Sequence, residues 1–227
     1  MISGVAPCCP PSKGSGIQYC PTHIDRNLVR GGTLRPSPGQ LCIGSWDVEG
    51  LTEAKIVTLE TYMQDQGIHL LCLQEVRKPL SEYYTTDAGF LLICSGGKED
   101  IEFAGVGFLV APYARNWVAA FREHTDRIAS ISLRVPGGKI LLVSIYAPHG
   151  GRGYYERQSF FDELGTFLEK SSSHGPKYIF GNFNARIHSR SKAEKHITGP
   201  YFYGNPNAES DPQSNANFSF NVARHTA

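Results

Sequence analysis

The fold class is decided by a stretch in the middle of the chain, Ile128-Ala-Ser-Ile-Ser-Leu-Arg-Val135-Pro-Gly-Gly-Lys139-Ile-Leu-Leu-Val-Ser-Ile145. Its two apolar runs, 128–135 and 139–145, flank a short Pro-Gly-Gly turn, which is typical of an antiparallel β-hairpin. A strictly alternating parallel-sheet fold should not contain such a block at its centre. Together with the elements around it, the hairpin therefore predicts an α+β sheet sandwich.

Two helices are expected outside this hairpin. Thr52 is a suitable N-cap for a helix that runs to about Gln66 and ends at Gly67. A second helix fits 154 to about 170, with a stripe of apolar residues at helical spacing. Short apolar runs predict further strands at 41–46, 69–74, 90–93, 105–110 and 177–180.

Composition divides the chain into three parts. Hydrophobic residues make up 41% of the 227 residues, which is enough for a core. Residues 1–38 are rich in Pro, Gly and Ser and are expected to form a disordered leader. Residues 39–217 are expected to form one incomplete domain, and residues 218–227 a divergent tail.

The net charge of +1 gives no sign of overall polyanion binding, although a local basic groove stays compatible with it.

Cysteine usage and hydropathy bear on the compartment. Three of the six cysteines, Cys42, Cys72 and Cys94, lie in apolar runs, where a free cysteine behaves as a small hydrophobic residue. The first residues do not resemble a signal peptide, and no apolar run is long enough to span a membrane. We expect a reduced intracellular protein, nuclear or cytoplasmic, that is not secreted and has no membrane partner.

Four segments place polar residues directly at the end of an apolar strand. They are Gly44-Ser-Trp-Asp47, Leu73-Gln-Glu75, Ile145-Tyr-Ala-Pro-His149 and Phe180-Gly-Asn-Phe-Asn-Ala185. Such positions hold a side chain rigidly and leave it open to substrate. A carboxylate such as Glu75 suits Mg²⁺, which prefers oxygen ligands. Tyr146 could donate to a phosphate or help to orient it, and Asn184 could orient either the scissile phosphate or the attacking water. Taken singly, Glu75 also fits a solvated strand end and Tyr146 a packed aromatic residue.

Taken together and in order, six segments resemble the endonuclease/exonuclease/phosphatase superfamily. The segments are GSWDVEGLT, IHLLCLQEVR, GVGFLV, RIASISLRV, LLVSIYAPH and FGNFNARIH. They are similar in particular to the apurinic-type endonuclease domains of non-LTR (LINE-like) retrotransposons, and the resemblance covers about residues 40–217. It implies a four-layer α/β sandwich of the DNase I-like type.

The resemblance also implies roles for individual residues. Glu75 matches the metal-binding glutamate, Tyr146 a phosphate-contacting tyrosine, and Asn184 the asparagine of a Gly-Asp-Phe-Asn motif. The implied cofactor is Mg²⁺, with Mn²⁺ as an alternative ion, and the implied partner is DNA, bound by a monomer. Arg127 matches a recurring arginine of the retrotransposon domains, and we assign it to substrate binding together with His149 and Arg186. His149, in a Pro-His-Gly-Gly loop, also fits a plain surface position.

Three features depart from the family pattern. Asp47 stands where the family has an asparagine, and we assign it to metal binding. Asn182 stands where the family has the aspartate thought to activate water, and a neutral amide cannot accept that proton. Beyond Asn217 the family's further strands and catalytic histidine have no match, which predicts a fold truncated at the C-terminus.

The expected function is metal-dependent hydrolysis of DNA phosphodiesters by an endonuclease of retrotransposon type. Two alternatives stay open: an inactive nucleic-acid-binding remnant, and a phosphatase of the same superfamily. Basic residues near the expected site could contact DNA phosphates or form a solvated surface; they are Arg152, Arg157, Arg186, Arg190, Lys192 and Lys195.

Overall fold

The computed structural model describes residues 18–19, 41–96, 104–171 and 175–184. They fall into two compact units, which are described separately. The first unit takes in the described residues up to Tyr146 and the segment from Ser171 to Asn182. The second unit takes in Ala147–Lys170 and, among the described residues that follow, Phe183 and Asn184. The predicted domain boundaries at 38 and 217 lie outside the described residues and stay a prediction.

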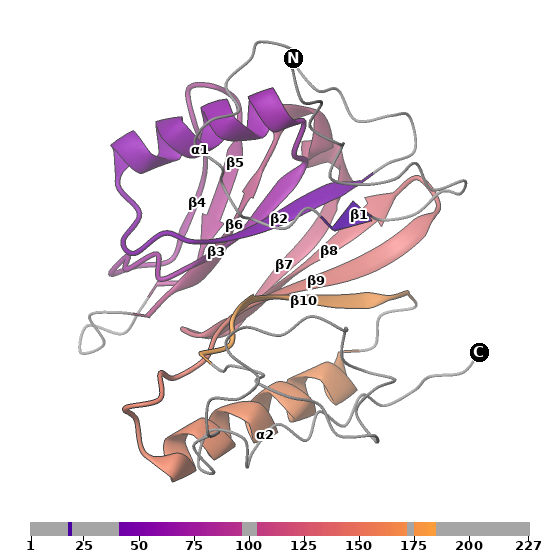
Figure 1. Cartoon of the computed structure of the whole chain (residues 1–227). Coiled ribbons are helices and arrows are strands. Elements are labelled where there is room, and N and C mark those ends of the chain that lie inside the picture. Colours follow the sequence, from indigo (N-terminus) through magenta and orange to yellow (C-terminus); the bar gives the residue numbers. More distant parts are fainter. Residues whose placement is uncertain (1–17, 20–40, 97–103, 172–174, 185–227) are drawn as a thin grey trace, which may run out of the picture. The chain divides into compact units, whose positions relative to one another are not determined.

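The first unit contains a mixed six-stranded sheet with the order β1-β2-β3-β6-β5-β4 (Figure 1). Its strands are β1 (Gln18–Tyr19), β2 (Cys42–Asp47), β3 (Leu70–Gln74), β4 (Glu82–Thr85), β5 (Leu91–Cys94) and β6 (Val106–Val110). β2 pairs in parallel with β1 and with β3, whereas the remaining neighbours are antiparallel. β1 falls inside the stretch that the sequence assigned to a disordered leader.

The second sheet of this unit has four strands in the order β10-β9-β8-β7. They are β7 (Val118–Thr125), β8 (Ile128–Val135), β9 (Gly138–Tyr146) and β10 (Lys177–Asn182), and a short 3₁₀ helix, η1 (Pro112–Trp117), precedes β7. The expected hairpin is β8–β9, which is antiparallel and closes with Val135 opposite Gly138. β10 then adds in parallel to β9.

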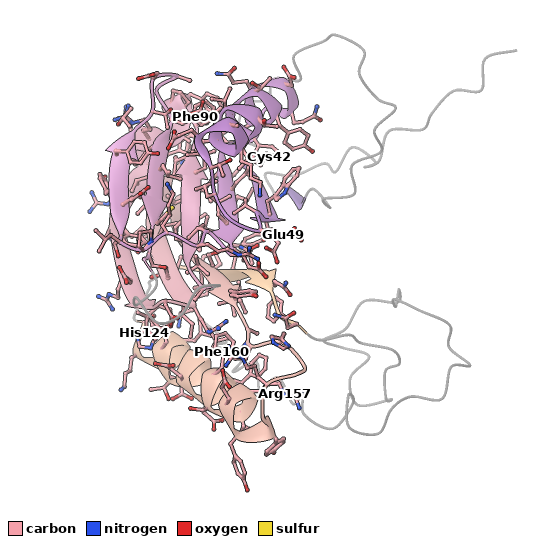
Figure 2. The ribbon with its side chains drawn as sticks, turned by 90° about the vertical axis from the view of Figure 1, so that its left-hand side faces the viewer. Cys42, Glu49, Phe90, His124, Arg157 and Phe160 are labelled. Atoms are coloured by element: carbon pink, nitrogen blue, oxygen red, sulfur yellow. The ribbon has the colours of Figure 1, made fainter. Side chains whose placement is uncertain are left out.

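The core of the first unit lies in two layers. Between the sheets, side chains such as Ile43 and Phe108 meet Ile131 and Leu142 in one buried cluster. On the other face of the six-stranded sheet, helix α1 (Glu53–Gln66) buries its apolar side against β3 and β5 (Figure 1). Phe90, labelled in Figure 2, belongs to this second cluster. The helix–sheet–sheet order confirms the α+β sandwich.

Local chemistry explains where the predicted helices begin and end. The Thr52 hydroxyl accepts a hydrogen bond from the Lys55 backbone N–H, and Gly67 ends α1 in the left-handed conformation with φ of 63°. In the second unit, α2 (Tyr154–Lys170) has the predicted bounds and buries Phe160, Leu164 and Phe167. No helix within the described ranges is long and apolar enough to cross a membrane.

The described cysteines agree with the expectation from the sequence. Cys42, Cys72 and Cys94 are free thiols, and the last two are fully buried. Burial raises the pKa of the Cys94 thiol to about 12, so this side chain stays uncharged and serves as core.

Gly107 allows β5 and β6 to approach closely, and its replacement should be costly. A Cβ atom at this position would lie 2.6 Å from the Ile93 backbone oxygen. We expect Gly107→Ala to reduce the free energy of unfolding by about 2 kcal/mol or more, because overpacked backbone must shift. Urea denaturation measures it.

Gly165 in α2 is the matched control, since no atom lies within 4 Å of the position that its Cβ would occupy. Gly165→Ala should be neutral or stabilising by up to about 1 kcal/mol, since alanine favours helix interiors. Equal effects of the two substitutions would contradict this account of the sheet.

Candidate functional site

The two sheets of the first unit bring four predicted side chains to the ends of their strands. β2 and β3 are parallel and in register with Asp47 opposite Gln74, so that Asp47 and Glu75 follow each other at neighbouring strand ends. β9 and β10 are also parallel, with Tyr146 opposite Asn182. The carboxyl ends of parallel strands thus place the four side chains as the sequence predicted.

Two hydrogen bonds join these strand ends across the sandwich. The Tyr146 hydroxyl donates to Glu75 Oε1 at 2.5 Å. The Asn182 amide nitrogen donates to Asp47 Oδ2 at 2.8 Å. Asp47 and Glu75 therefore each have a donor from the four-stranded sheet, and polar contacts join the two sheets at this edge next to the apolar cluster that includes Tyr146.

A buried polar chain lies beneath these contacts. Ser45 donates to Gln74 Oε1, Gln74 Nε2 donates to the Ser144 hydroxyl, and Ser144 donates to the Leu73 carbonyl, each at 3.0 Å. Gln74 and Ser144 are almost completely buried. Since buried polar groups are stable only when paired, this chain fixes the register of β3 against β9 next to Glu75 and Tyr146.

The loops after β2 and β3 have an unusual backbone. Glu49, Glu75 and Arg77 all have positive φ, at 45°, 51° and 50°. Residues other than glycine seldom adopt this conformation, and it concentrates at functional sites. Backbone hydrogen bonds from Gly50 to Glu75 and from Val76 to Gly105 hold the loops in place. The strain is therefore built into the segments that carry the two carboxylates.

Lys55 on α1 holds the first of these loops. Its ammonium group donates to the backbone carbonyls of Val48, Glu49 and Gly50 at 2.5, 3.0 and 2.9 Å. Glu49 is labelled in Figure 2, in the loop that follows β2. The lysine thus anchors the residues that follow Asp47 to the helix.

Burial and charge shift the pKa values of the site in a common direction. Desolvation raises the pKa of Asp47 above its usual 3.8, and the neighbouring Glu75 carboxylate raises it further, against the lowering effect of the Asn182 hydrogen bond. Desolvation, the hydrogen bond to Glu75 and its charge raise the pKa of Tyr146 to about 12. Tyr146 is therefore a neutral hydrogen-bond donor at physiological pH.

Arg127 lies against Tyr146. Its guanidinium carbon is 5.0 Å from the centre of the Tyr146 ring, and its Nη1 donates to the Tyr146 carbonyl at 3.3 Å. Cation–π contact of this kind orients both side chains. Arg127 is thus connected to the site by its contacts with Tyr146.

The remaining predicted residues belong to the second unit or lie outside the described residues. Asn184 and His149 belong to the second unit, where Asn184 donates to the Ala147 carbonyl at 2.6 Å and the His149 ring accepts from Gly151 at 2.9 Å. Among the predicted basic residues, Arg152 pairs with Glu156 on α2 at 3.9 Å. Arg186, Arg190, Lys192 and Lys195 lie outside the described residues.

Sequence reasoning missed Arg77, which is part of the site. Its guanidinium lies 2.6 Å from Glu75 Oε2. The sequence held no signal for this contact, because both Glu75 and Arg77 have positive φ and the i, i+2 rule for extended strands does not apply to them. The roles of Lys55 and Ser144 depend on loop conformation and on cross-sheet pairing, for which the sequence held no signal either.

Comparison with curated proteins gives a distant relative. No protein-family profile matches the sequence. The chain is 24% identical over 174 residues to craniofacial development protein 2 of Bos taurus, a match that covers 77% of this chain and 29% of that protein. The chain therefore spans less than a third of the length of this relative.

Solved structures similar to the chain include three nucleic-acid enzymes. The AP endonuclease LMAP from Leishmania major has a TM-score of 0.48 at 17% identity, over 63% of this chain and 54% of that one. The 3′ phosphatase NExo from Neisseria, bound to a product DNA hairpin, has a TM-score of 0.47 at 17% identity, over 63% and 58%. The endonuclease domain of TRAS1, a telomere-specific non-LTR retrotransposon, has a TM-score of 0.45 at 13% identity, over 63% and 59%.

Proposed function

We propose that this chain hydrolyses DNA phosphodiesters with the help of a divalent cation, as an endonuclease of retrotransposon type. The observation that carries the proposal is the pairing of Glu75 with Tyr146 and of Asp47 with Asn182 at one edge of the sandwich. DNA as the substrate rests on the resemblance of the six sequence segments, and not on geometry.

The donor set fits Mg²⁺ or Mn²⁺. Asp47 and Glu75 follow neighbouring parallel strands and lie near enough for the Glu75 charge to raise the pKa of Asp47. A cation bound between two carboxylates reduces the repulsion between their charges. In proteins, Mg²⁺ is held by one or two carboxylates and several waters. The described residues contain no group of three acidic, histidine or cysteine ligands, so a site closed by protein ligands alone is not expected. When bound, the ion would stabilise charge that develops on phosphate oxygens.

The chain's own residues would bind and orient the phosphodiester. Tyr146 stays protonated because of its raised pKa, and its one hydroxyl proton, which Glu75 now accepts, would be donated to a phosphate oxygen when a cation binds Glu75. Arg127, stacked on the Tyr146 ring, adds positive charge beside it. Asn184, two residues after Asn182, is proposed to orient substrate as its counterpart does in the resembled family.

The exchange between positions 47 and 182 keeps one carboxylate and one amide in a single hydrogen-bonded pair. The resembled family has the amide on the first strand and the carboxylate at position 182, whereas this chain has the reverse arrangement. Asn182 donates its amide N–H to Asp47 Oδ2, and the backbone N–H of Glu49 donates to Asp47 Oδ1 at 3.4 Å. Asp47 is thus the group of the pair that could accept a proton from water.

A second candidate function is nucleic-acid binding without cleavage. One observation favours it: both oxygens of Glu75 already have partners, Tyr146 on one and Arg77 on the other. A carboxylate whose two oxygens already accept hydrogen bonds binds a cation less tightly than a carboxylate without such partners. The two candidates differ in one measurable outcome, which is whether a supercoiled plasmid is nicked.

Glu75→Gln should reduce Mg²⁺-dependent nicking of supercoiled plasmid by about 100-fold or more, because losing several kcal/mol of charge stabilisation has that effect on rate. The matched control is Glu53→Gln, an exposed glutamate in the first turn of α1, which should nick like the wild type. Agarose gels resolve nicked and supercoiled forms. Wild-type protein that binds DNA but does not nick it with Mg²⁺ or Mn²⁺ would favour the second candidate.

Asp47→Asn should raise the melting temperature at pH 7 in metal-free buffer, because folding no longer places a desolvated carboxylate beside Glu75. The raised pKa of Asp47 means that its contribution to stability declines as pH rises from 3.8 through the folded-state value. The gain should therefore shrink as pH falls toward 3.8, because the folded wild type takes up a proton at Asp47 at higher pH than the unfolded chain does.

Adding Mg²⁺ should reverse this order, since the wild type has two carboxylates for the ion and the variant has one. Asp65→Asn, at an exposed position of α1, is the control. Differential scanning calorimetry between pH 4 and pH 8, with and without Mg²⁺, measures both effects. A variant that is less stable than the wild type in metal-free buffer at pH 7 would contradict the electrostatic account.

A further inference from the structure

Both carboxylate oxygens of Glu75 accept hydrogen bonds, one from a hydroxyl group and the other from a guanidinium group. Tyr146 occupies Oε1 at 2.5 Å, and the Arg77 guanidinium lies 2.6 Å from Oε2. The side chain of Glu75 is only 14% exposed, whereas that of Arg77 is 35% exposed. The carboxylate therefore sits at the inner end of an ion pair whose cationic end faces solvent.

The backbone fixes this ion pair in advance. Glu75 and Arg77 both have positive φ, and the N–H of Arg77 donates to the Ala104 carbonyl at 3.0 Å. The stem of Arg77 also passes over Gly50, since a Cβ there would lie 3.6 Å from Arg77 Cδ. The positive φ of Gly50 and the hydrogen-bonded loop thus preorganise the guanidinium of Arg77 toward Glu75.

We propose that Arg77 is a built-in counter-cation of Glu75 that competes with the divalent metal and so sets the metal concentration at which the site fills. The inference rests on the proposed function, because it assumes that Glu75 is a metal ligand. Arg77 touches neither substrate nor reacting atoms in this account. It is a positioning residue that acts through Glu75.

Charge explains the direction of the effect. A guanidinium in contact with Glu75 repels an incoming divalent ion and occupies a carboxylate oxygen that the ion needs. Because the guanidinium is partly exposed, solvent screens the ion pair, and the ion can displace it. In the absence of metal, the same arginine balances the charge of Glu75 through a contact of 2.6 Å. Removing Arg77 should therefore loosen the metal-free protein and tighten metal binding.

The test is direct titration with Mn²⁺, observed by electron paramagnetic resonance of the free ion. Arg77→Met keeps an apolar stem over Gly50 and removes the charge, and it should bind Mn²⁺ about tenfold more tightly than the wild type. Arg77→Lys keeps a cation and should stay within about threefold of the wild type. Arg115→Met is the matched control, since Arg115 lies in η1 and donates to the Gly89 carbonyl, away from Glu75. It should bind Mn²⁺ like the wild type.

A second measurement does not depend on enzyme activity. The rise in melting temperature on adding Mg²⁺ should be larger for Arg77→Met than for the wild type, and the metal-free melting temperature should be lower. Arg77→Gln supplies a second neutral variant if the methionine variant fails to fold. Either neutral variant then decides the question by the same titration.

The outcomes separate this inference from the proposed function. Wild-type binding of Mn²⁺ that Glu75→Gln removes, with unchanged or weaker binding by the neutral Arg77 variants, overturns the role of Arg77 alone. Absence of Mn²⁺ binding by the wild type and by the neutral variants overturns both proposals. Tighter binding by the neutral variants, with Arg77→Lys and Arg115→Met near the wild type, supports both.

Discussion

The hydrogen bond between Tyr146 and Glu75 is the contact on which the rest of the site depends. It joins the end of β9 in one sheet to the end of β3 in the other, above the buried chain of Gln74 and Ser144. Two sheets that met only through apolar side chains could slide by fractions of a residue, because dispersion forces have little directional preference. Directional polar bonds at the strand ends remove that freedom, and they do so at the point where Glu75 and Asp47 must keep a fixed spacing.

That rigidity has an electrostatic cost. Two carboxylates at adjacent strand ends repel each other, and burial adds to the penalty, as the raised pKa values of Asp47 and Tyr146 record. Positive groups around them reduce the cost: Arg77 at Glu75, and Arg127 at the Tyr146 ring. The backbone strain at Glu49, Glu75 and Arg77 has the same location. Strain and like-charge repulsion at one strand end are features that concentrate at functional sites, and they agree with the cation site proposed above.

Much of this arrangement could be predicted from the sequence, and the exceptions have physical reasons. Hydrophobic runs and capping residues predicted the bounds of β8, β9, α1 and α2 to within one or two residues. This was possible because burial of one face makes apolar residues recur at a regular spacing along the sequence. β7 was missed since most of its side chains are partly or fully exposed, so no apolar alternation marks it. β4, with four residues of alternating partial burial, is too short to stand out. The side chains of the site were predicted by type and order, but Arg77 was not, because its role depends on two left-handed residues in a loop.

The pairing of Asp47 with Asn182 changes what the two departures from the family pattern mean. Read separately along the chain, one substitution adds a charge and the other removes one. In the folded protein the two residues share a hydrogen bond of 2.8 Å, so they form one acid–amide pair with its members exchanged between sheets. The exchange moves the carboxylate from the four-stranded sheet to the strand end beside Glu75, which concentrates negative charge on one side of the site. Arg77 stands on that same side. The cation beside Glu75 and the carboxylate at Asp47 therefore form one electrostatic arrangement, and the effect of either residue on the site depends on the other.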